Sequence, residues 1–255
     1  MMLATWNVNS IRAREPRVRA WVAEQRPDVL CLQELKCEEK QFPLEWFHEQ
    51  GFHVAMAAQK TYNGVAIVSR FPLEDVQAGL NDGDDDAQAR LIAATVQGVR
   101  IASAYFPNGQ SLGSEKYQYK LRWMQRLRAH LDARYRPDQL LALCGDFNVA
   151  PEPRDVHDPA KWEASVLFSP EVREELRRVQ AFGLSDAFRK FHQEPAFSWW
   201  DYRAGMFRRD AGLRIDHVFV TAGLAARCVS ARIDREARKG DGASDHAPVL
   251  VAMDL

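Results

Sequence analysis

Polar side chains with potential ligand atoms stand at the ends of several apolar runs of this chain. They are Asn7 and Asn9, Glu34, Asp146 and Asn148, Asp216 and His217, and the run Ser244-Asp245-His246. Any one of them could be an ordinary surface turn residue, but the repetition indicates side chains that line a common site. Carboxylates and amide oxygens without a thiolate favour a hard cation such as Mg²⁺, which keeps waters for a substrate phosphate.

The same residues include groups that move protons or bind negative charge. A histidine beside an aspartate, as in Asp245-His246, is a candidate proton acceptor near neutral pH. Asn148 and Tyr105 can each donate a hydrogen bond to a negatively charged oxygen. A metal ion, a base and neutral donors in one place are suited to the hydrolysis of a phosphate ester.

The apolar runs predict the strands that would position these side chains. Strands are expected over residues 3–8, 28–34, 64–69, 91–96, 99–105, 139–144, 215–220 and 249–253. Helical spacing predicts helices over 14–25 and 112–135, the second with a face dense in Lys and Arg that we expect to be solvated. Several strands follow one another without a helix between them, which argues against a doubly wound parallel sheet. We therefore expect an α/β fold with two sheets packed face to face and helices outside.

Length and charge limit the domain organisation and the partners. The 255 residues contain no internal repeat and no low-complexity linker, so one domain over residues 1–255 is expected, with loops at 81–86 and 150–159. Lys and Arg number 34 against 35 Asp and Glu, and the net charge of −1 excludes nucleic-acid binding by global charge but not by a local basic face.

Cysteine usage and hydropathy predict a cytoplasmic protein. The four cysteines form no C-x-x-C pair, which argues against a zinc ribbon, and Cys31 and Cys144 lie in apolar runs typical of buried positions. The sequence shows no disulfide framework, no signal-peptide pattern and no apolar run of ~18 residues that would span a membrane. The histidines expected at the surface are His48, His53, His130, His157 and His192, whereas His217 is expected to be packed in a strand.

Seven short motifs occur along the chain: TWNVNSIR at 5–12, LQELK at 32–36, YNGVAI at 62–67, GDFNVAP at 145–151, FSWWDYR at 197–203, GLRIDH at 212–217 and SDHAP at 244–248. In order and spacing the chain resembles the exonuclease III type AP endonucleases of the endonuclease/exonuclease/phosphatase superfamily. The resemblance implies a four-layer α-β-β-α sandwich, two packed mixed sheets flanked by helices, with the site at one end. It also implies a Mg²⁺ site, for which Mn²⁺ can substitute, with Glu34 as the main ligand. The implied ligand set is Asn7, Glu34, Asp146, Asn148, Asp245 and His246.

The resemblance further implies catalytic roles. Asp146 and Asn148 would hold the attacking water and the scissile phosphate, which Tyr105 and Asn108 would also contact. His246, oriented by Asp216, would polarise or deprotonate that water. Whether Asp146 or His246 is the base stays open, as does a ligand role for Asn9.

The implied partner is double-stranded DNA with 3′ ends, nicks or abasic sites, bound by a monomer. Trp199, Leu213 and Ile215 would form an apolar pocket for a terminal or baseless sugar, although Trp199 and Trp200 could also belong to the core. Arg203, Arg208, Arg209 and Arg214 are opposed only by Asp210. We expect Arg208 and Arg209 to contact DNA phosphates with little sequence specificity, whereas Arg90 could contact the backbone or be a solvated loop charge.

One departure from the family pattern bears on the substrate. In relatives that cut at abasic sites, a small residue precedes the Phe-x-Pro segment, whereas here Leu167 precedes Phe168-Ser169-Pro170. A bulky side chain at this position would obstruct a flipped abasic sugar. We therefore expect 3′-5′ exonuclease and 3′-phosphatase activity, with abasic-site cleavage in doubt.

Two other functions fit parts of the sequence. A superfamily phosphatase acting on lipid or inositol phosphates would use the same catalytic residues, but the Trp199 motif argues against it. A non-catalytic DNA-binding module should have lost Glu34, Asp146, Asn148, Asp216 or His246, and all of them are present.

Overall fold

The computed structural model describes residues 1–255 and contains two six-stranded mixed sheets. Sheet A has the strand order β11-β12-β1-β2-β4-β3, and sheet B has the order β5-β6-β7-β8-β10-β9. Sheet A comprises β1 (Met2–Asn7), β2 (Val29–Gln33), β3 (His53–Ala57), β4 (Val65–Ser69), β11 (Cys228–Ile233) and β12 (Val249–Met253). Sheet B comprises β5 (Glu74–Ala78), β6 (Leu91–Val96), β7 (Val99–Tyr105), β8 (Leu141–Asp146), β9 (Leu184–Asp186) and β10 (Asp216–Thr221).

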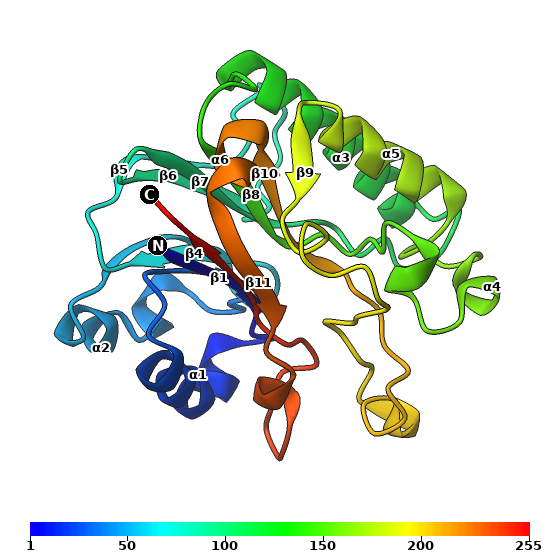
Figure 1. Cartoon of the computed structure of the whole chain (residues 1–255), viewed down its shortest axis with the longest axis horizontal. Coiled ribbons are helices and arrows are strands. Elements are labelled where there is room, and N and C mark those ends of the chain that lie inside the picture. The colour runs from blue at the N-terminus through cyan, green and yellow to red at the C-terminus, as the bar shows by residue number, and fades with distance from the viewer.

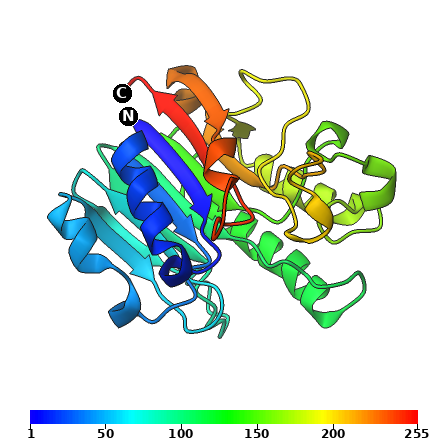
Figure 2. The same cartoon turned by 90° about the horizontal axis from the view of Figure 1, so that it is seen from below.

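Helices cover the outer faces of both sheets (Figures 1 and 2). Helices α1 (Ile11–Gln25) and α2 (Leu44–Glu49) lie against sheet A, and α3 (Glu115–Arg134) and α5 (Pro170–Gln180) lie against sheet B. The remaining helices are α4 (Pro159–Trp162), α6 (Ala222–Arg227) and the 3-10 turns η1 (Glu39–Gln41), η2 (Pro153–Asp155), η3 (Arg203–Gly205) and η4 (Arg235–Arg238). The order helix, sheet, sheet, helix confirms the predicted four-layer sandwich.

Alternation along the strands explains why the sheets pack in this way. In β1, Leu3 faces the core between the sheets, whereas Ala4 and Trp6 belong to the core beneath α1. Both faces of such a strand are buried, so its sequence is almost continuously apolar rather than alternating. The same alternation directs Asn7, an odd-numbered residue, towards sheet B, where its amide meets Asp146.

Strand pairing brings the chemistry-bearing ends of both sheets to one place. The parallel pair β1 and β2 ends at Asn7 and Gln33, directly before Glu34. In sheet B, β8 ends at Asp146, which pairs with Asp216 at the start of the antiparallel strand β10. Carboxyl ends of parallel strands and the amino end of an antiparallel neighbour share one edge of a sheet, so these residues converge.

Most predicted strands are present within one or two residues, but several elements were missed. Strands β3, β5, β9 and β11 and helix α5 had no predicted counterpart. Helix α5 does carry a helical apolar spacing at Val172, Leu176 and Val179, a signal that the prediction overlooked. The helix predicted over 112–135 begins only at Glu115, because the Ser114 side chain accepts a hydrogen bond from the Tyr117 amide and caps it.

Two surface predictions are corrected. Arg126 on α3 does not face open solvent but pairs with Asp82, Asp84 and Asp86 of the loop at 81–86, so each of the two charged segments neutralises the other. His130, expected at the surface, is buried and donates from Nδ1 to the Leu80 carbonyl at 2.7 Å. All four cysteines are buried and free.

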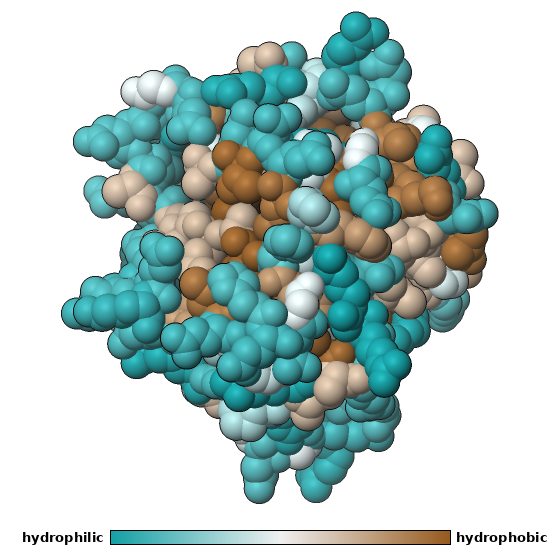
Figure 3. All heavy atoms as spheres, turned by 90° about the vertical axis from the view of Figure 1, so that its left-hand side faces the viewer, coloured by the Kyte–Doolittle hydropathy of each residue, from teal (hydrophilic) through white to brown (hydrophobic).

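Both termini lie at the left of Figure 1, and the Met1 amino group donates to the Met253 carbonyl at 2.6 Å. Figure 3 views this side, where apolar residues gather across the middle of a largely polar face. No helix has the length and hydropathy required to cross a membrane.

Gly145 illustrates how tightly β7 and β8 approach before Asp146. A Cβ atom at this position would lie 1.8 Å from the Ala104 carbonyl oxygen, and the φ angle is +145°. We predict that Gly145→Ala lowers the free energy of unfolding by about 3 kcal/mol or more, because backbone must move to relieve the clash.

Urea unfolding measures this change, with Gly98→Ala as the control. Gly98 has a φ angle of +77° but open space around the position of its Cβ, so only the backbone preference of glycine is lost there. Equal destabilisation by the two substitutions would contradict the steric explanation.

Candidate active site

The Asn7 side chain joins the two sheets at the centre of the site. Its amide nitrogen donates to Glu34 Oε1 and to Asp146 Oδ2, both at 2.8 Å. Its amide oxygen accepts the Asn9 backbone N–H at 2.9 Å. The neutral Asn7 amide thus binds two carboxylates that come from different sheets.

Glu34 follows β2 with a left-handed φ of 52°, which turns its side chain into the site. Lys36 lies beside it, with Nζ 2.6 Å from Glu34 Oε2, and also donates to Asn9 Oδ1 at 2.7 Å. Burial alone would raise the pKa of Glu34, but the Lys36 ammonium outweighs it, and the net pKa shift is downwards. Glu34 is therefore ionised at neutral pH.

Asp146 and Asn148 form a compact turn after β8. Asp146 Oδ1 accepts the Asn148 backbone N–H at 2.8 Å, and its Oδ2 accepts the Asn148 side-chain amide at 3.2 Å. The Asn148 amide also donates to the Phe106 carbonyl, and its oxygen accepts from Asn108 Nδ2 at 3.1 Å. Asn148 has a left-handed φ of 49°, so this turn is strained and its side-chain bonds hold it in place.

His246 and Asp216 form a buried pair next to Asp146. Nδ1 of His246 lies 2.9 and 3.0 Å from the two Asp216 carboxylate oxygens, which places a proton on that nitrogen. Nε2 lies 3.8 Å from Asp146 Oδ2. The Ser198 hydroxyl donates to Asp216 Oδ2 at 2.6 Å and fixes the carboxylate from behind.

Charges in this buried volume shift one another's protonation. Burial would lower the pKa of His246, but the carboxylates of Asp216 and Asp146 reverse this and raise it to about 10. Burial, together with the negative charges of Asp216 and Glu34, raises the pKa of Asp146 to about 7 although His246 opposes the shift. Near neutral pH the imidazole is thus protonated, and Asp146 is the group whose charge changes most readily.

Tyr105 and Asn108 border the same site. Burial and the nearby charges of Glu34 and Asp146 raise the pKa of the Tyr105 phenol, so it stays a neutral donor. Arg90 lies over the Tyr105 ring at 4.9 Å and donates to its carbonyl oxygen at 3.2 Å. Arg90 is buried; it supports Tyr105 and is not a solvated loop charge.

Asp245 stands slightly apart from the other predicted metal ligands. Its Oδ1 accepts from Asn9 Nδ2 at 2.9 Å and its Oδ2 accepts from Trp199 Nε1 at 3.0 Å. Both oxygens are thus engaged by neutral donors. The structure therefore places Asp245 beside the central cluster, between the TWNVNSIR and FSWWDYR motifs.

Glu34, Asp146 and His246 offer ligand atoms that all lie within 4.8 Å of one another. The two carboxylates supply the oxygen ligands that a hard divalent cation prefers. His246 Nδ1 is hydrogen-bonded to Asp216, so only Nε2 of His246 is available to the cluster. The arrangement fits a divalent metal ion bound mainly by Glu34 and Asp146.

The residues predicted to form the apolar pocket are neighbours in the core. Trp199 pairs by backbone with both Leu213 and His246, and its indole lies 6.5 Å from the His246 ring. Leu213, Ile215 and Leu167 belong to one apolar cluster, against which Trp199 packs, and all three are almost inaccessible to solvent. Trp200 is fully buried in the core instead.

The basic loop divides into exposed and buried arginines. Arg208 and Arg209 are exposed and have no carboxylate within 4.0 Å, whereas Arg203 pairs with Asp201. Arg214, expected in the same basic cluster, is instead buried and pairs with Asp155 and Asp186 at 2.7 Å. It is therefore a structural residue and does not contribute to a DNA-facing surface.

His217 is packed, as predicted. It accepts a hydrogen bond from Arg214 at Nδ1 and donates from Nε2 to the Val149 carbonyl at 2.9 Å. Burial and the Arg214 charge lower its pKa to about 4, so it is neutral. Its role is to join β10 to the turn after Asn148.

Sequence reasoning missed two site residues, Lys36 and Ser198. Each lies inside a motif that was quoted for other residues, LQELK and FSWW. A lysine two positions after the main carboxylate and a serine before the pocket tryptophan were the available signals. Their partners, Glu34 and Asp216, are visible only in three dimensions.

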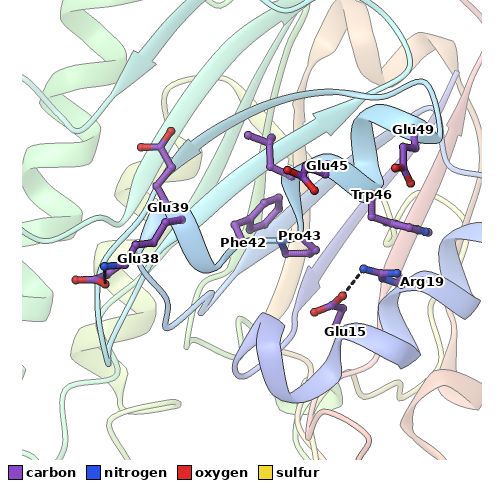
Figure 4. A pocket seen from close by; sticks show the side chains of 11 residues that line it. Glu15, Arg19, Glu38, Glu39, Phe42, Pro43, Glu45, Trp46 and Glu49 are labelled. Atoms are coloured by element: carbon purple, nitrogen blue, oxygen red, sulfur yellow. Dashed lines mark hydrogen bonds and ion pairs between the residues drawn. The ribbon is translucent and has the colours of Figure 1, made fainter.

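A groove of about 980 Å³ lies away from this site, between α1 and α2 (Figure 4). Phe42 and Trp46 contribute aromatic surface, and Arg19 pairs with Glu15. The acidic side chains around it are Glu15, Glu38, Glu39, Glu45 and Glu49. This excess of negative charge makes the groove unsuitable for a polyanion.

We predict that Glu34→Gln weakens divalent metal binding by at least about tenfold, because the amide keeps the shape but loses the ligand charge. Calorimetric titration with Mn²⁺ measures the affinity, and circular dichroism checks the fold. Glu39→Gln, an exposed position in η1, is the control. An affinity within twofold of the unsubstituted protein would show that Glu34 is not the main ligand.

Comparison with known proteins places this geometry in a family. The model of the Endonuclease/Exonuclease/phosphatase family matches residues 4–246. Exodeoxyribonuclease III of Haemophilus influenzae is 32% identical over 262 residues, with 98% of each chain covered. An AP endonuclease from Archaeoglobus fulgidus is similar over the whole of both chains at 40% identity with a TM-score of 0.97. The 3′ phosphatase NExo from Neisseria, solved with a product DNA hairpin, is similar over the whole of both chains at 42% identity with a TM-score of 0.96. This chain therefore belongs to the endonuclease/exonuclease/phosphatase family, and within it to the exonuclease III type enzymes.

Proposed function

We propose that this protein is a Mg²⁺-dependent DNA repair phosphodiesterase that removes nucleotides and phosphate from 3′ ends of double-stranded DNA. The observation that carries the proposal is the cluster of Glu34, Asp146 and His246 within 4.8 Å, backed by Asp216. Exodeoxyribonuclease III and the 3′ phosphatase NExo, both similar over nearly the whole chain, support the assignment to DNA ends. Four free cysteines fit the reducing cytoplasm, where such an enzyme would meet DNA.

The whole chain is proposed to act as one domain and as a monomer. Sheet A supplies Asn7 and Glu34, and sheet B supplies Asp146 and Asp216. Neither sheet alone would complete the site. No residue from a second copy is needed to complete this set.

The metal would be held by Glu34 and Asp146, with Asn7, Asn148, Asp245 and His246 around it. When bound, Mg²⁺ supplies charge that stabilises the negatively charged phosphate oxygens in the transition state. Asp146, which lies 3.8 Å from Nε2 of His246, orients the attacking water and accepts its proton. His246, protonated because of Asp216, directs its Nε2–H at a phosphate oxygen and is not the base. Asn148, Asn108 and Tyr105 donate to the remaining oxygens.

The DNA contacts are proposed to come from two regions. Arg208 and Arg209, exposed and without acidic partners, contact phosphates of the duplex. Trp199, with Leu213 and Ile215 behind it, receives the terminal sugar. Leu167 narrows the space needed by a flipped abasic nucleotide, so abasic-site cleavage is the weakest of the proposed activities.

Two other functions receive less support. A phosphatase acting on lipid or inositol phosphates would not need the exposed arginines Arg208 and Arg209, which could contact duplex DNA. A non-catalytic DNA-binding module would not need Asp216 and Ser198 to be held in hydrogen-bonded register behind His246. The same assay separates all three functions.

The test is release of phosphate from a 3′-phosphorylated nicked duplex in Mg²⁺, compared with an inositol phosphate. We predict DNA-dependent turnover that His246→Asn lowers by roughly 10²–10⁴-fold in kcat with little change in KM, because the imidazolium acts in the transition state. His48→Asn, at an exposed position on α2, should keep full activity. Preference for the inositol phosphate, or no turnover of DNA, would refute the proposed function.

Neutralising Arg208 and Arg209 together should weaken binding to all DNA sequences alike. Each lost phosphate contact should reduce the slope of log K against log salt concentration by about 0.9. Fluorescence anisotropy at several salt concentrations measures the slope. The control removes the same charge from Arg122 and Arg134, exposed on α3. An unchanged slope in the first variant would show that the loop does not face DNA.

Leu167→Gly should raise abasic-site cleavage relative to 3′-phosphate removal by about tenfold or more, since relieving ~1.4 kcal/mol of steric exclusion gives that factor. Similarity alone does not decide between these substrates, because an AP endonuclease and a 3′ phosphatase are almost equally similar to this chain. The metal cluster is untouched, so 3′-phosphatase activity is the internal control. A constant ratio of the two activities would rule out Leu167 as the obstacle.

A further inference from the structure

Lys120 is a buried lysine that the proposed chemistry does not use. It lies on α3, its side chain is fully buried, and its ammonium donates to backbone carbonyl groups rather than to a carboxylate. Burial lowers its pKa to about 7, opposed only by the charge of Asp146. Lysine is rarely fully buried without a partner, because its charge loses the stabilisation of water. Something in the fold must compensate for that loss.

Three backbone carbonyl groups surround the Lys120 nitrogen. Nζ donates to the Asn148 and Val166 oxygens at 2.7 Å and to the Asn108 oxygen at 3.2 Å. An ammonium has three N–H donors and a neutral amine only two, so three acceptors around one nitrogen fit the protonated form. All of the hydrogen-bonding capacity of the ammonium is used within the protein.

The three carbonyls come from three separate loops that border the active site. Asn108 lies in the loop after β7, Asn148 in the turn after β8, and Val166 in the segment directly before Leu167. Hydrogen bonds also join these loops in pairs, from the Ala150 amide to the Leu167 carbonyl at 2.8 Å and from Asn108 Nδ2 to Asn148 Oδ1 at 3.1 Å, whereas the Lys120 ammonium contacts all three. One buried ammonium therefore connects the phosphate-binding residues with the residue that narrows the pocket.

Two features show that the loops are shaped around this lysine. Gly109 lies against its stem, and a Cβ there would be 3.1 Å from Lys120 Cδ and 3.3 Å from the Tyr117 ring. Asn148 adopts a left-handed φ of 49°, and its carbonyl group points at Nζ in that conformation. A strained residue of this kind persists only where its surroundings hold it.

We propose that Lys120 is a positioning residue of the active site, which holds the Asn108 and Asn148 side chains at the scissile phosphate by binding the carbonyl groups of their loops. The expected effect on turnover rests on the proposed function. The expected effect of Lys120 on the three loops does not. Lys120 is fully buried, and its ammonium donates to backbone carbonyl groups and not to the side chains of Glu34, Asp146 or His246. Its loss should therefore reduce turnover and leave ground-state DNA affinity unchanged.

The experiment compares Lys120→Met with Lys120→Gln and with the control Lys116→Met. Met keeps most of the side-chain volume but has no donor, whereas Gln keeps an N–H group of slightly shorter reach. Lys116 lies one turn earlier on α3 and is exposed. Thermal unfolding establishes that each variant is folded. If Lys120→Met does not fold, Lys120→Gln is compared with the unsubstituted protein instead.

Two readouts are measured, 3′-phosphate release in Mg²⁺ and amide hydrogen exchange without DNA. We expect Lys120→Met to lower kcat by about 10²-fold, because a misplacement of about 1 Å has that effect. Its KM and its metal-free Kd for duplex DNA should stay within twofold. The kcat of Lys120→Gln should lie between those of Lys120→Met and the unsubstituted protein. The kcat of Lys116→Met should equal that of the unsubstituted protein. Exchange should accelerate at 107–111, 147–151 and 164–168 but not in β1 or β2.

Each contrary result has a distinct meaning. Unchanged kcat in folded Lys120→Met overturns the positioning role, even if exchange accelerates. Lowered kcat without accelerated exchange in the three loops overturns it as well, since the lysine would then act by another route. If the unsubstituted protein does not hydrolyse DNA, the proposed function fails by itself. In that case the exchange measurement alone decides whether Lys120 holds the three loops.

Discussion

Glu34, Asp146 and Asp216 approach one another where the ends of the two sheets meet, and burial weakens the screening of their negative charges. At an effective dielectric constant of 20, two like charges 4 Å apart repel by roughly 4 kcal/mol. The surroundings of the site offset this repulsion. The Asn7 amide lies between Glu34 and Asp146, Lys36 pairs with Glu34, and His246 is protonated against Asp216. A divalent cation held by Glu34 and Asp146 would offset the same repulsion further.

This constraint explains which parts of the site the sequence could predict. Carboxylates and amides at strand ends are visible as polar residues after apolar runs, and Glu34, Asp146 and Asp216 were found in that way. The two-sheet architecture also followed, because strands such as β6 and β7 are adjacent without a helix between them. Four strands escaped prediction, β3, β5, β9 and β11. Of these, β5 is polar and largely exposed, and β9 has only three residues. Their pairing comes from neighbours in the sheet, which no local pattern reveals.

The ion-pair partners of buried charged residues were the features that the sequence predicted least well. Arg214 stands in a run of basic residues and was expected to face DNA, but it pairs with Asp155 and Asp186, which lie 59 and 28 positions away in sequence. Arg126 likewise pairs with the acidic loop at 81–86. In each case the partner is distant along the chain, so composition shows the charge but not its neutralisation. Counting basic residues in a segment therefore overstates the charge it presents to DNA.

The site is held by backbone as much as by side chains. Non-glycine residues with left-handed φ angles occur at Asn9, Glu34, Lys36, Asn63 and Asn148. Such conformations are uncommon and cluster where the surrounding structure over-determines them. Here the Lys36 amide donates to the Asn63 carbonyl at 3.0 Å, and the Asn9 amide donates to Asn7 Oδ1. Each strand thus ends in a sharp turn that is fixed before substrate arrives.

A preformed site of this kind has a consequence for how DNA is bound. Side chains that are held in place before the substrate binds need little reorganisation during the reaction, which is the basis of electrostatic preorganisation. In the proposed mode of binding, the movement comes largely from the DNA, whose terminus leaves the duplex stack to reach Trp199. A 3′ end that frays does so with little loss of stacking, whereas an internal nucleotide must be extruded. In the proposed mode of DNA binding, the preformed strand ends and the bulk of Leu167 act in the same direction, and both favour termini over internal positions.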